Sequence, residues 1–155
     1  HSALSKIENN HISPTFETIL KITSGLETDI SDLLTSFQNK TPRTRQVFTR
    51  KGEGERHETD NYLYETLCNE ILNKKMIPIL THIKSHSLEK FGELMRHSGE
   101  ELFLVLEGNV ELITEHYASV KLEQGDCAYF DSSMGHACIS TSEREAIIFW
   151  VSTPY

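Results

Sequence analysis

The sequence predicts a mainly β protein that begins with a small α-helical segment. Two observations lead to this fold class. Apolar residues recur at helical spacing up to residue 38, whereas from about residue 46 onward they follow the two-residue period of strands. Glycine-containing turn signals separate many of these short strand runs, which is typical of a β-barrel or β-sandwich. We therefore divide the chain into a helical segment (1–38), a linker (39–45) and a β domain (46–155).

Three short helices are expected before the linker. The first covers residues 2–8. Ser13 and Pro14 predict the start of the second, with serine as the N-cap and proline at the first helical position, and Gly25 stands where this helix would end. The third begins near Asp29. Three helices of this size cannot enclose a core by themselves, so they need further sequence or another subunit to pack against.

The linker is polar, contains a proline and shows no apolar period. Nine runs after it are predicted as strands. They are residues 47–49, 62–64, 76–84, 102–106, 110–114, 119–122, 127–130, 137–140 and 146–151. Residues 65–73 fit either a short helix or a further strand, and the pattern does not decide between them.

Composition sets bounds on the class of protein. A hydrophobic share of 37% and a charged share of 25% are those of a soluble globular domain. No apolar run approaches the roughly 18 residues of a membrane span, and no signal-peptide pattern opens the chain. The three cysteines, Cys68, Cys127 and Cys138, form no C-x-x-C pair and are odd in number. A reduced, cytoplasmic compartment is therefore expected.

The formal net charge of −8 is distributed unevenly. Residues 1–50 carry six basic and five acidic side chains, whereas residues 51–155 carry nine basic and eighteen acidic ones. An acidic β domain does not attract nucleic acid through its own field. Any contact with nucleic acid must therefore come from the N-terminal segment.

Two histidines and a carboxylate form a candidate metal site in the β domain. His97 and Glu101 are four residues apart, and His136 follows on a later predicted strand. Residues two or four apart on a strand share a face, so Met95, His97 and Glu101 can line one wall if that strand runs straight. This donor set suits zinc, nickel, manganese or iron(II). Met95 offers only a thioether, a poor ligand for hard divalent ions.

The spacing His97-x3-Glu101-x6-Gly108 resembles the second half of the first cupin motif, and Gly125-x10-His136 resembles the spine of the second. The resemblance implies a cupin (double-stranded β-helix or jelly-roll) barrel with His97, Glu101 and His136 as ligands of one divalent metal. In cupins a further histidine stands at the position of Met95. The second motif also departs from the family pattern, with Asp131, Ser133 and Ser140 in place of the usual proline, glycine and asparagine.

Simpler interpretations stand beside this one. A single histidine or glutamate on a strand is more often a satisfied polar residue than a ligand, and a methionine is more often core filler. A metal-free alternative is an apolar pocket that binds a small acid through His97 or His136. Its expected lining residues, for which core packing is the default, are Met95, Phe103, Tyr129 and Trp150. His57 and His116 carry no functional signal.

Residues 2–22 together with 29–34 are similar to the back half of an XRE-type, repressor-like helix-turn-helix domain. The resemblance implies that residues 2–8 are the recognition helix and that the chain is truncated at its N-terminus, because two preceding helices are absent. Contacts with DNA are then expected through the complete parent protein. The residues implied are Ser2, Ser5 and Lys6 for base edges, and Asn9, Asn10 and His11 for phosphates. The alternative is a small exposed polar helix with no such role.

The two resemblances occur in the order found in bacterial transcriptional regulators with a C-terminal cupin sensor domain. Membership of that group implies a cytoplasmic homodimer that binds DNA and a small-molecule effector and that is not an enzyme. The alternative function is a metal-dependent cupin enzyme of the dioxygenase or isomerase type that uses His97, Glu101 and His136.

Overall fold

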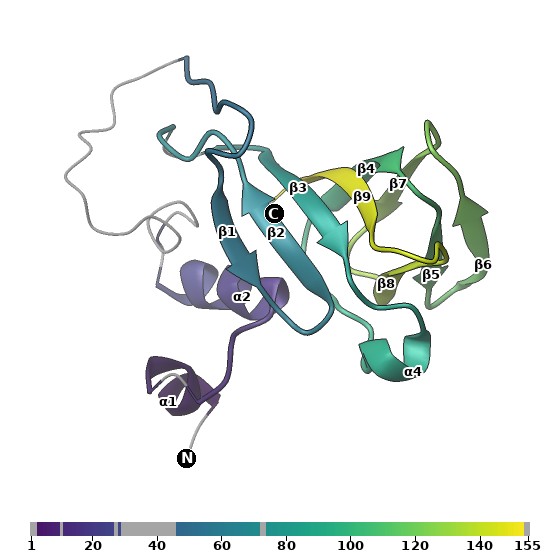
Figure 1. The fold of residues 1–155 in the computed structure, drawn as a ribbon. Coiled ribbons are helices and arrows are strands. Elements are labelled where there is room, and N and C mark those ends of the chain that lie inside the picture. The colour runs from purple at the N-terminus through teal and green to yellow at the C-terminus, as the bar shows by residue number, and fades with distance from the viewer. Residues whose placement is uncertain (1–2, 10, 27, 29–45, 72–73, 154–155) are drawn as a thin grey trace.

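The computed structural model describes residues 3–9, 11–26, 28, 46–71 and 74–153 (Figure 1). The N-terminal helices are α1 (Ala3–Glu8) and α2 (Phe16–Gly25), and a short helix α4 (Leu88–Phe91) lies within the β domain. The strands are β1 (Glu55–Glu58), β2 (Tyr62–Thr66), β3 (Ile77–Ile83), β4 (Glu100–Glu107), β5 (Val110–Thr114), β6 (Tyr117–Leu122), β7 (Cys127–Asp131), β8 (His136–Ser140) and β9 (Ala146–Ser152).

The strands form two antiparallel sheets that face each other (Figure 1). One has the order β1-β2-β3-β9-β4-β7 and the other the order β6-β5-β8. The predicted mainly β fold is confirmed, and the two sheets are consistent with a jelly-roll. Among the described residues, none of the helices has the length and apolar character that a membrane crossing requires.

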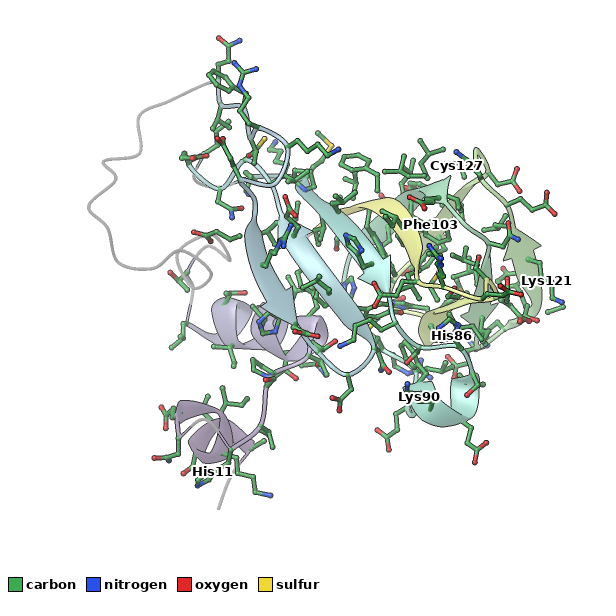
Figure 2. The ribbon with its side chains drawn as sticks, in the orientation of Figure 1. His11, His86, Lys90, Phe103, Lys121 and Cys127 are labelled. Atoms are coloured by element: carbon green, nitrogen blue, oxygen red, sulfur yellow. The ribbon has the colours of Figure 1, made fainter. Side chains whose placement is uncertain are left out.

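The core lies between the sheets and follows from the two-residue period. Along β3 and β9 every second side chain is buried and the others are half-buried. Ile79, Trp150 and Phe103 are paired side by side across β3, β9 and β4. The rings of Phe103 and Trp150 lie 5.6 Å apart, and both side chains are buried. Figure 2 shows Phe103 inside the barrel. Burial of each large apolar side chain contributes about 1.5–3 kcal/mol.

Two local predictions were wrong. The structure has no strand at residues 47–49, and Phe48 is exposed. The edge strand is β1 instead, four residues of sequence ERHE that pair with β2. The second helix is capped by Thr15 rather than Ser13, because the Thr15 hydroxyl accepts a hydrogen bond from the Thr18 amide (3.2 Å).

Helix α2 packs on the barrel through its apolar side. Phe16, Ile19 and Leu20 are buried. Just ahead of the helix, the carbonyl oxygen of Pro14 lies 3.0 Å from Nε2 of His57 on β1. The predicted third helix and linker lie outside the described residues, and a helix-turn-helix arrangement of the N-terminal segment stays a prediction.

Replacing Gly108 by alanine should destabilise the fold more than the same change at Gly125. Both glycines have positive φ (78° and 95°), which costs an alanine roughly 1–2 kcal/mol. A Cβ at Gly108 would also lie 2.8 Å from Ser142 Oγ and 3.2 Å from Ala146 Cβ, whereas at Gly125 it meets nothing within 4 Å. Overpacking adds about 1–3 kcal/mol at Gly108 alone. Thermal unfolding of the two variants measures the difference, and equal losses would contradict the packing argument.

Candidate metal centre

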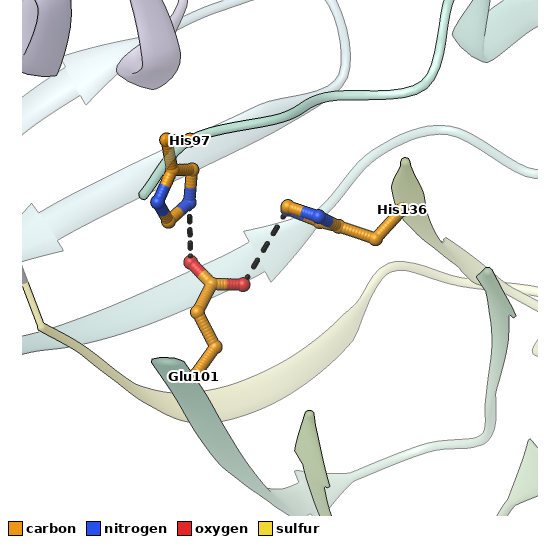
Figure 3. A group of neighbouring side chains, drawn as sticks. All are labelled: His97, Glu101 and His136. Carbon is orange, nitrogen blue, oxygen red and sulfur yellow. Dashed lines mark hydrogen bonds and ion pairs between the residues drawn. The ribbon is translucent and has the colours of Figure 1, made fainter. Parts of the chain in front are cut away.

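Three buried side chains, one from each sheet and one from the segment before β4, meet inside the barrel (Figure 3). Glu101 is the second residue of β4 in the six-stranded sheet, and His97 precedes that strand. His136 is the first residue of β8 in the three-stranded sheet. Their exposed fractions are 9% for His97, 3% for Glu101 and 0% for His136.

The chain between His97 and Glu101 is bent, so the condition of a straight strand, on which a shared face depended, is not met. β4 begins only at Glu100, and Gly99 has a φ of 109° that turns the backbone. The bend is held by the loop before β8, because the His97 amide donates to the Ser132 carbonyl (3.0 Å) and the Ser132 amide donates to the Gly99 carbonyl (3.1 Å). His97 and Glu101 therefore converge through a turn rather than along one strand face.

The distances define a compact donor set. His97 Nε2 lies 2.9 Å from Glu101 Oε1, and His136 Nε2 lies 3.5 Å from Glu101 Oε2 (Figure 3). One ligand atom from each residue lies within 4.8 Å of the other two. The two imidazole rings meet edge to face, with centroids 5.4 Å apart.

The hydrogen bonds of the other ring nitrogens determine what this cluster can bind. His97 Nδ1 lies 3.1 Å from the Ser98 carbonyl oxygen, and His136 Nδ1 lies 2.9 Å from the Met134 carbonyl oxygen. A carbonyl only accepts, so Nδ1 carries the proton in both rings and Nε2 presents a lone pair in the neutral imidazole. The carboxylate of Glu101 also only accepts, so the 2.9 Å hydrogen bond between His97 Nε2 and Glu101 Oε1 requires a second proton on that ring, and a metal ion bound through the Nε2 atoms would take the place of that proton.

This donor set fits a divalent metal. Zinc bonds nitrogen and carboxylate ligands at about 2.0–2.2 Å, so adjacent donors around such an ion lie roughly 3 Å apart. The pairs at 2.9 and 3.5 Å are close to that spacing. Histidine nitrogen and carboxylate oxygen suit zinc, iron(II), manganese and nickel alike, so the ligands define a class of metal rather than one element.

Two titratable side chains beside the candidate metal centre stay neutral at physiological pH. Burial, and then the negative charge of Glu101, raise the pKa of Tyr64 well above its usual value. The same two causes, in the same order, raise the pKa of the Cys138 thiol. Neither residue therefore adds a negative charge, and the carboxylate of Glu101 is the anion that these neighbours leave for a cation.

Glu115 ties the two histidine-bearing loops together, a role that the sequence did not signal. Its carboxylate accepts a hydrogen bond from Arg96 (2.6 Å) and one from the Gly135 amide (3.4 Å). Arg96 immediately precedes His97, and Gly135 immediately precedes His136. Glu115 lies in the turn between β5 and β6, so a surface ion pair fixes the spacing of two buried ligands.

The four predicted pocket residues occupy three different environments. Met95 is half-buried and lines a pocket of about 900 Å³ between the barrel mouth and residues 11–15. Phe103 and Trp150 are core residues. The prediction for Tyr129 was wrong, because its side chain is 63% exposed on the outer face of β7, where alternation from the buried Phe130 places it.

The residues predicted to contact DNA lie on or beside α1 where they are described. Ser5 and Lys6 are on the helix, and the Asn9 amide donates to the Ser5 carbonyl (2.7 Å). His11 follows the helix, as Figure 2 shows, and lines the pocket already described. Ser2 and Asn10 lie outside the described residues. A contact of these side chains with DNA stays a prediction.

Residues 88–152 match the family model described as a cupin domain, and this part of the chain is therefore a cupin domain. It contains His97, Glu101 and His136. The match leaves residues 1–38 unassigned. No curated protein matches the chain by sequence.

Several solved structures share the fold. Hydroxypropylphosphonic acid epoxidase from S. wedmorenis superposes with a TM-score of 0.62 at 18% identity, covering 89% of this chain and 74% of its own. A structure entitled FeII HppE gives 0.61 at 17% identity, with 89% and 75% covered. An RmlC-like cupin from Shewanella frigidimarina NCIMB 400 gives 0.56 at 13% identity, with 71% and 92% covered. At these identities the likeness establishes the fold alone.

Replacing Arg96 by glutamine should raise the pKa of Glu115. The hydrogen bond from Arg96 is the main cause that lowers this pKa from 4.5 to about 2. Because the folded-state pKa is depressed, the stabilisation from this pair is present above the unfolded pKa and is lost as the pH falls from about 4.5 through about 2. Carboxyl NMR titration of Arg96→Gln should therefore show Glu115 titrating nearer 4.5. An unchanged pKa would show that the Gly135 amide and other contacts set it.

Proposed function

We propose that this chain is part of a bacterial transcriptional regulator. In that regulator the cupin domain would bind a divalent metal and sense a small molecule. Residues 1–38 would supply the later helices of a helix-turn-helix unit, and the complete unit would bind DNA in the cytoplasm. One observation carries the proposal: the N-terminal helical segment packs directly against a ligand of the candidate metal centre.

That contact is made by Phe16, the first residue of α2. Its ring is 5% exposed and lies 5.4 Å from the Tyr64 ring and 6.5 Å, edge to face, from the imidazole of His97. A regulator requires two sites and a physical element whose position both of them influence. Here α2 belongs to the segment that resembles a DNA-binding domain, and its first side chain touches the proposed sensing site.

The pocket between this segment and the barrel offers space for an effector. Ile12, Ser13 and Thr15 line one side, and Tyr64 and Met95 line the other. A ligand in this pocket would touch both the N-terminal segment and the barrel. It would thereby favour one position of the N-terminal segment relative to the barrel. The free energy of this preference equals the difference between the ligand's binding free energies in the two positions.

A bound metal would supply a Lewis-acid centre with open coordination positions for a small ligand. His97, Glu101 and His136 would hold it. Residues of the chain set the surroundings: Phe130 packs against His136 with ring centroids 5.2 Å apart, and Phe16 covers the side of His97. An apolar lining of this kind excludes water and strengthens the electrostatic attraction between the ligands and a cation.

The metal-free chain should bind one divalent ion with an affinity that depends on the three ligands. Titration calorimetry with zinc, nickel, manganese and, without oxygen, iron(II) should give one site per chain. Glu101→Ala and His136→Ala should each weaken binding at least roughly a hundredfold, because each removes a direct ligand. A bound ion should also raise the melting temperature by mass action.

His116→Ala is the matched control for the metal experiment. The His116 side chain is 63% exposed in the β5–β6 turn and lies outside the ligand set. This variant should bind the ion as the wild type does. If no ion binds above trace stoichiometry, or if the three variants lose affinity equally, the proposed metal centre is wrong.

Phe16→Ala should weaken metal binding even though Phe16 is not a ligand. Coupling between two sites is reciprocal, and typical values correspond to about a 5–150-fold change in affinity. We expect the calorimetric affinity for zinc to fall at least roughly fivefold in Phe16→Ala. In the wild type, zinc should slow hydrogen exchange of the α2 amides, and His136→Ala should abolish that protection.

Leu26→Ala is the control for this experiment, because Leu26 follows α2 and is 65% exposed. It should leave the affinity for zinc unchanged. If zinc binds normally to Phe16→Ala and leaves α2 exchange unchanged in the wild type, the metal centre stands and the regulator proposal loses its support.

A metal-dependent cupin enzyme of the dioxygenase or isomerase type is the second candidate. A set of three protein ligands, which leaves coordination positions open for a substrate, favours it. Two of the structural neighbours are hydroxypropylphosphonic acid epoxidase and FeII HppE. Turnover of a small-molecule substrate that depends on the loaded metal and is lost in Glu101→Ala would favour the enzyme over the regulator.

A further inference from the structure

A buried aromatic floor closes the pocket between the N-terminal segment and the barrel mouth. Tyr62, Tyr64 and Phe91 line the pocket, and all three side chains are buried. Their rings form one connected group, because the Tyr62 ring lies 5.3 Å from that of Tyr64 and 5.6 Å from that of Phe91. Leu94 and Met95 add further apolar surface. A cavity of about 900 Å³ with such a lining fits an organic molecule that has an apolar body.

One polar group of this floor points to a ligand. The Tyr64 side chain is 4% exposed, and within the described part of the chain its hydroxyl has no hydrogen-bond partner. The hydroxyl of the neighbouring Tyr62, by contrast, donates to the Cys138 carbonyl (2.9 Å). Buried polar groups are normally hydrogen-bonded, and a phenol can donate or accept. A polar atom of a bound molecule would therefore satisfy Tyr64.

The charges around the pocket leave an excess of carboxylate. Among the described residues, three carboxylates and two ammonium groups line it, a formal balance of −1 with His11 neutral. They are Glu58, Asp60, Glu93, Lys84 and Lys90. The chain itself neutralises one pair, because the Lys84 ammonium donates to Glu58 (2.8 Å) and to the Thr59 carbonyl (2.7 Å). Asp60 and Glu93 are then opposed by Lys90 alone.

Asp60 and Glu93 flank a single contact between two elements. The side-chain amide of Asn61 donates to the Phe91 carbonyl (2.9 Å), which joins the β1–β2 turn to the end of α4. Asp60 immediately precedes Asn61, and Glu93 follows Phe91 by two residues. Both carboxylates are exposed, and in the described ranges neither forms an ion pair or a side-chain hydrogen bond. They therefore give the pocket a negative rim.

A cation fits this rim better than an anion does. An anion would find Lys90 on α4 (Figure 2), but the two carboxylates of the rim would repel it. The formal charge of −8 on the chain also favours the approach of cations. An ammonium ion near the rings of the floor would gain cation–π attraction as well. Charge and aromatic lining thus select the same chemical class.

We propose that the effector of this pocket is an organic amine, bound as its ammonium ion, that carries an apolar body and a second polar group. The ammonium group would lie between Asp60 and Glu93, the apolar body on the aromatic floor, and the second polar group at the Tyr64 hydroxyl. The assignment rests on the proposed effector pocket and adds the chemistry of its occupant. It is independent of the metal centre, whose three ligands do not line the pocket.

Three probes of nearly equal size test the charge of the occupant. Tyramine has an ammonium group, an aromatic ring and a hydroxyl, whereas tyrosol and phloretate replace the ammonium group by a neutral hydroxyl and a carboxylate. Titrations of the full chain followed by amide NMR shifts should locate tyramine through Ser13 and Asn61, one on each side of the pocket. Its dissociation constant should be at least roughly fivefold lower than that of either other probe, because two exposed ion pairs are gained.

Variants assign this preference to residues. The double variant Asp60→Asn, Glu93→Gln should abolish the preference for tyramine over tyrosol. The control Glu89→Gln, Glu143→Gln makes the same change of net charge at exposed positions outside the pocket and should keep the preference. Tyr64→Phe should weaken tyramine binding roughly fivefold through loss of one hydrogen bond, and should keep the preference over tyrosol. Melting curves establish that each variant is folded.

Binding of tyrosol or phloretate as tight as that of tyramine would overturn the proposal. So would the absence of shifts at Ser13 and Asn61 with all three probes, an equal loss of preference in the control variant, or an unchanged affinity for tyramine in Tyr64→Phe. Failure of the regulator proposal is a different result. If tyramine binds as expected but zinc leaves α2 exchange unchanged, the amine site stands and the regulator falls. If zinc protects α2 but tyramine has no preference, the regulator stands and the amine site falls.

Discussion

The convergence of two imidazoles and one carboxylate in a single buried space is the constraint on which the rest of this structure depends. His97 and His136 each use Nδ1 on a backbone carbonyl, so both direct Nε2 towards the carboxylate of Glu101. Burial of an ionised carboxylate without a positive partner costs several kcal/mol. The arrangement is therefore stable only with protons or a metal ion among the three side chains, and the spacing of the atoms suits a metal.

The same constraint explains why contacts outside the candidate metal centre affect that centre. Glu101 belongs to one sheet, His136 to the other and His97 to the segment before β4, so the ligands keep their spacing only while these three parts stay together. The backbone of Met95 bonds to that of His136 in both directions at 2.9 Å, and the carboxylate of Glu115 binds the residue before each histidine. These contacts hold the ligand-bearing loops together and act on the metal centre without touching it.

The predictable parts of the fold and site are those that follow from periodicity and motif spacing. Alternation located β3 and β9, and the spacing of His97, Glu101 and His136 identified residues that the structure brings together. β1 was missed because its four residues, ERHE, lack an apolar alternation and owe their conformation to pairing with β2. Tyr129 was placed inside because its aromatic character was weighed above its position next to the inward Phe130.

Other features depend on contacts between distant parts of the chain, and no local pattern encodes them. Glu115 is one of many acidic residues in the sequence, and its role arises because a turn between two strands brings it to Arg96 and Gly135. His57 showed no signal, yet its ring meets the carbonyl of Pro14 and joins the N-terminal segment to β1. In the sequence Phe16 is an ordinary apolar helix residue. Only the packing of α2 brings its ring against the imidazole of His97.

Met95 shows how one residue difference from the cupin motif can change what a site of this kind binds. The backbone of Met95 pairs with that of His136, so the architecture of the site is retained, but the site lacks a fourth ligand, which would be its third nitrogen. The Met95 side chain lines the pocket that residues 11–15 close from the other side. The thioether therefore gives this pocket, which none of the three ligand residues lines, an apolar wall on the side of the barrel. A molecule bound against this wall would contact both parts of the chain at once, which is the contact that sensing requires and that catalysis alone does not.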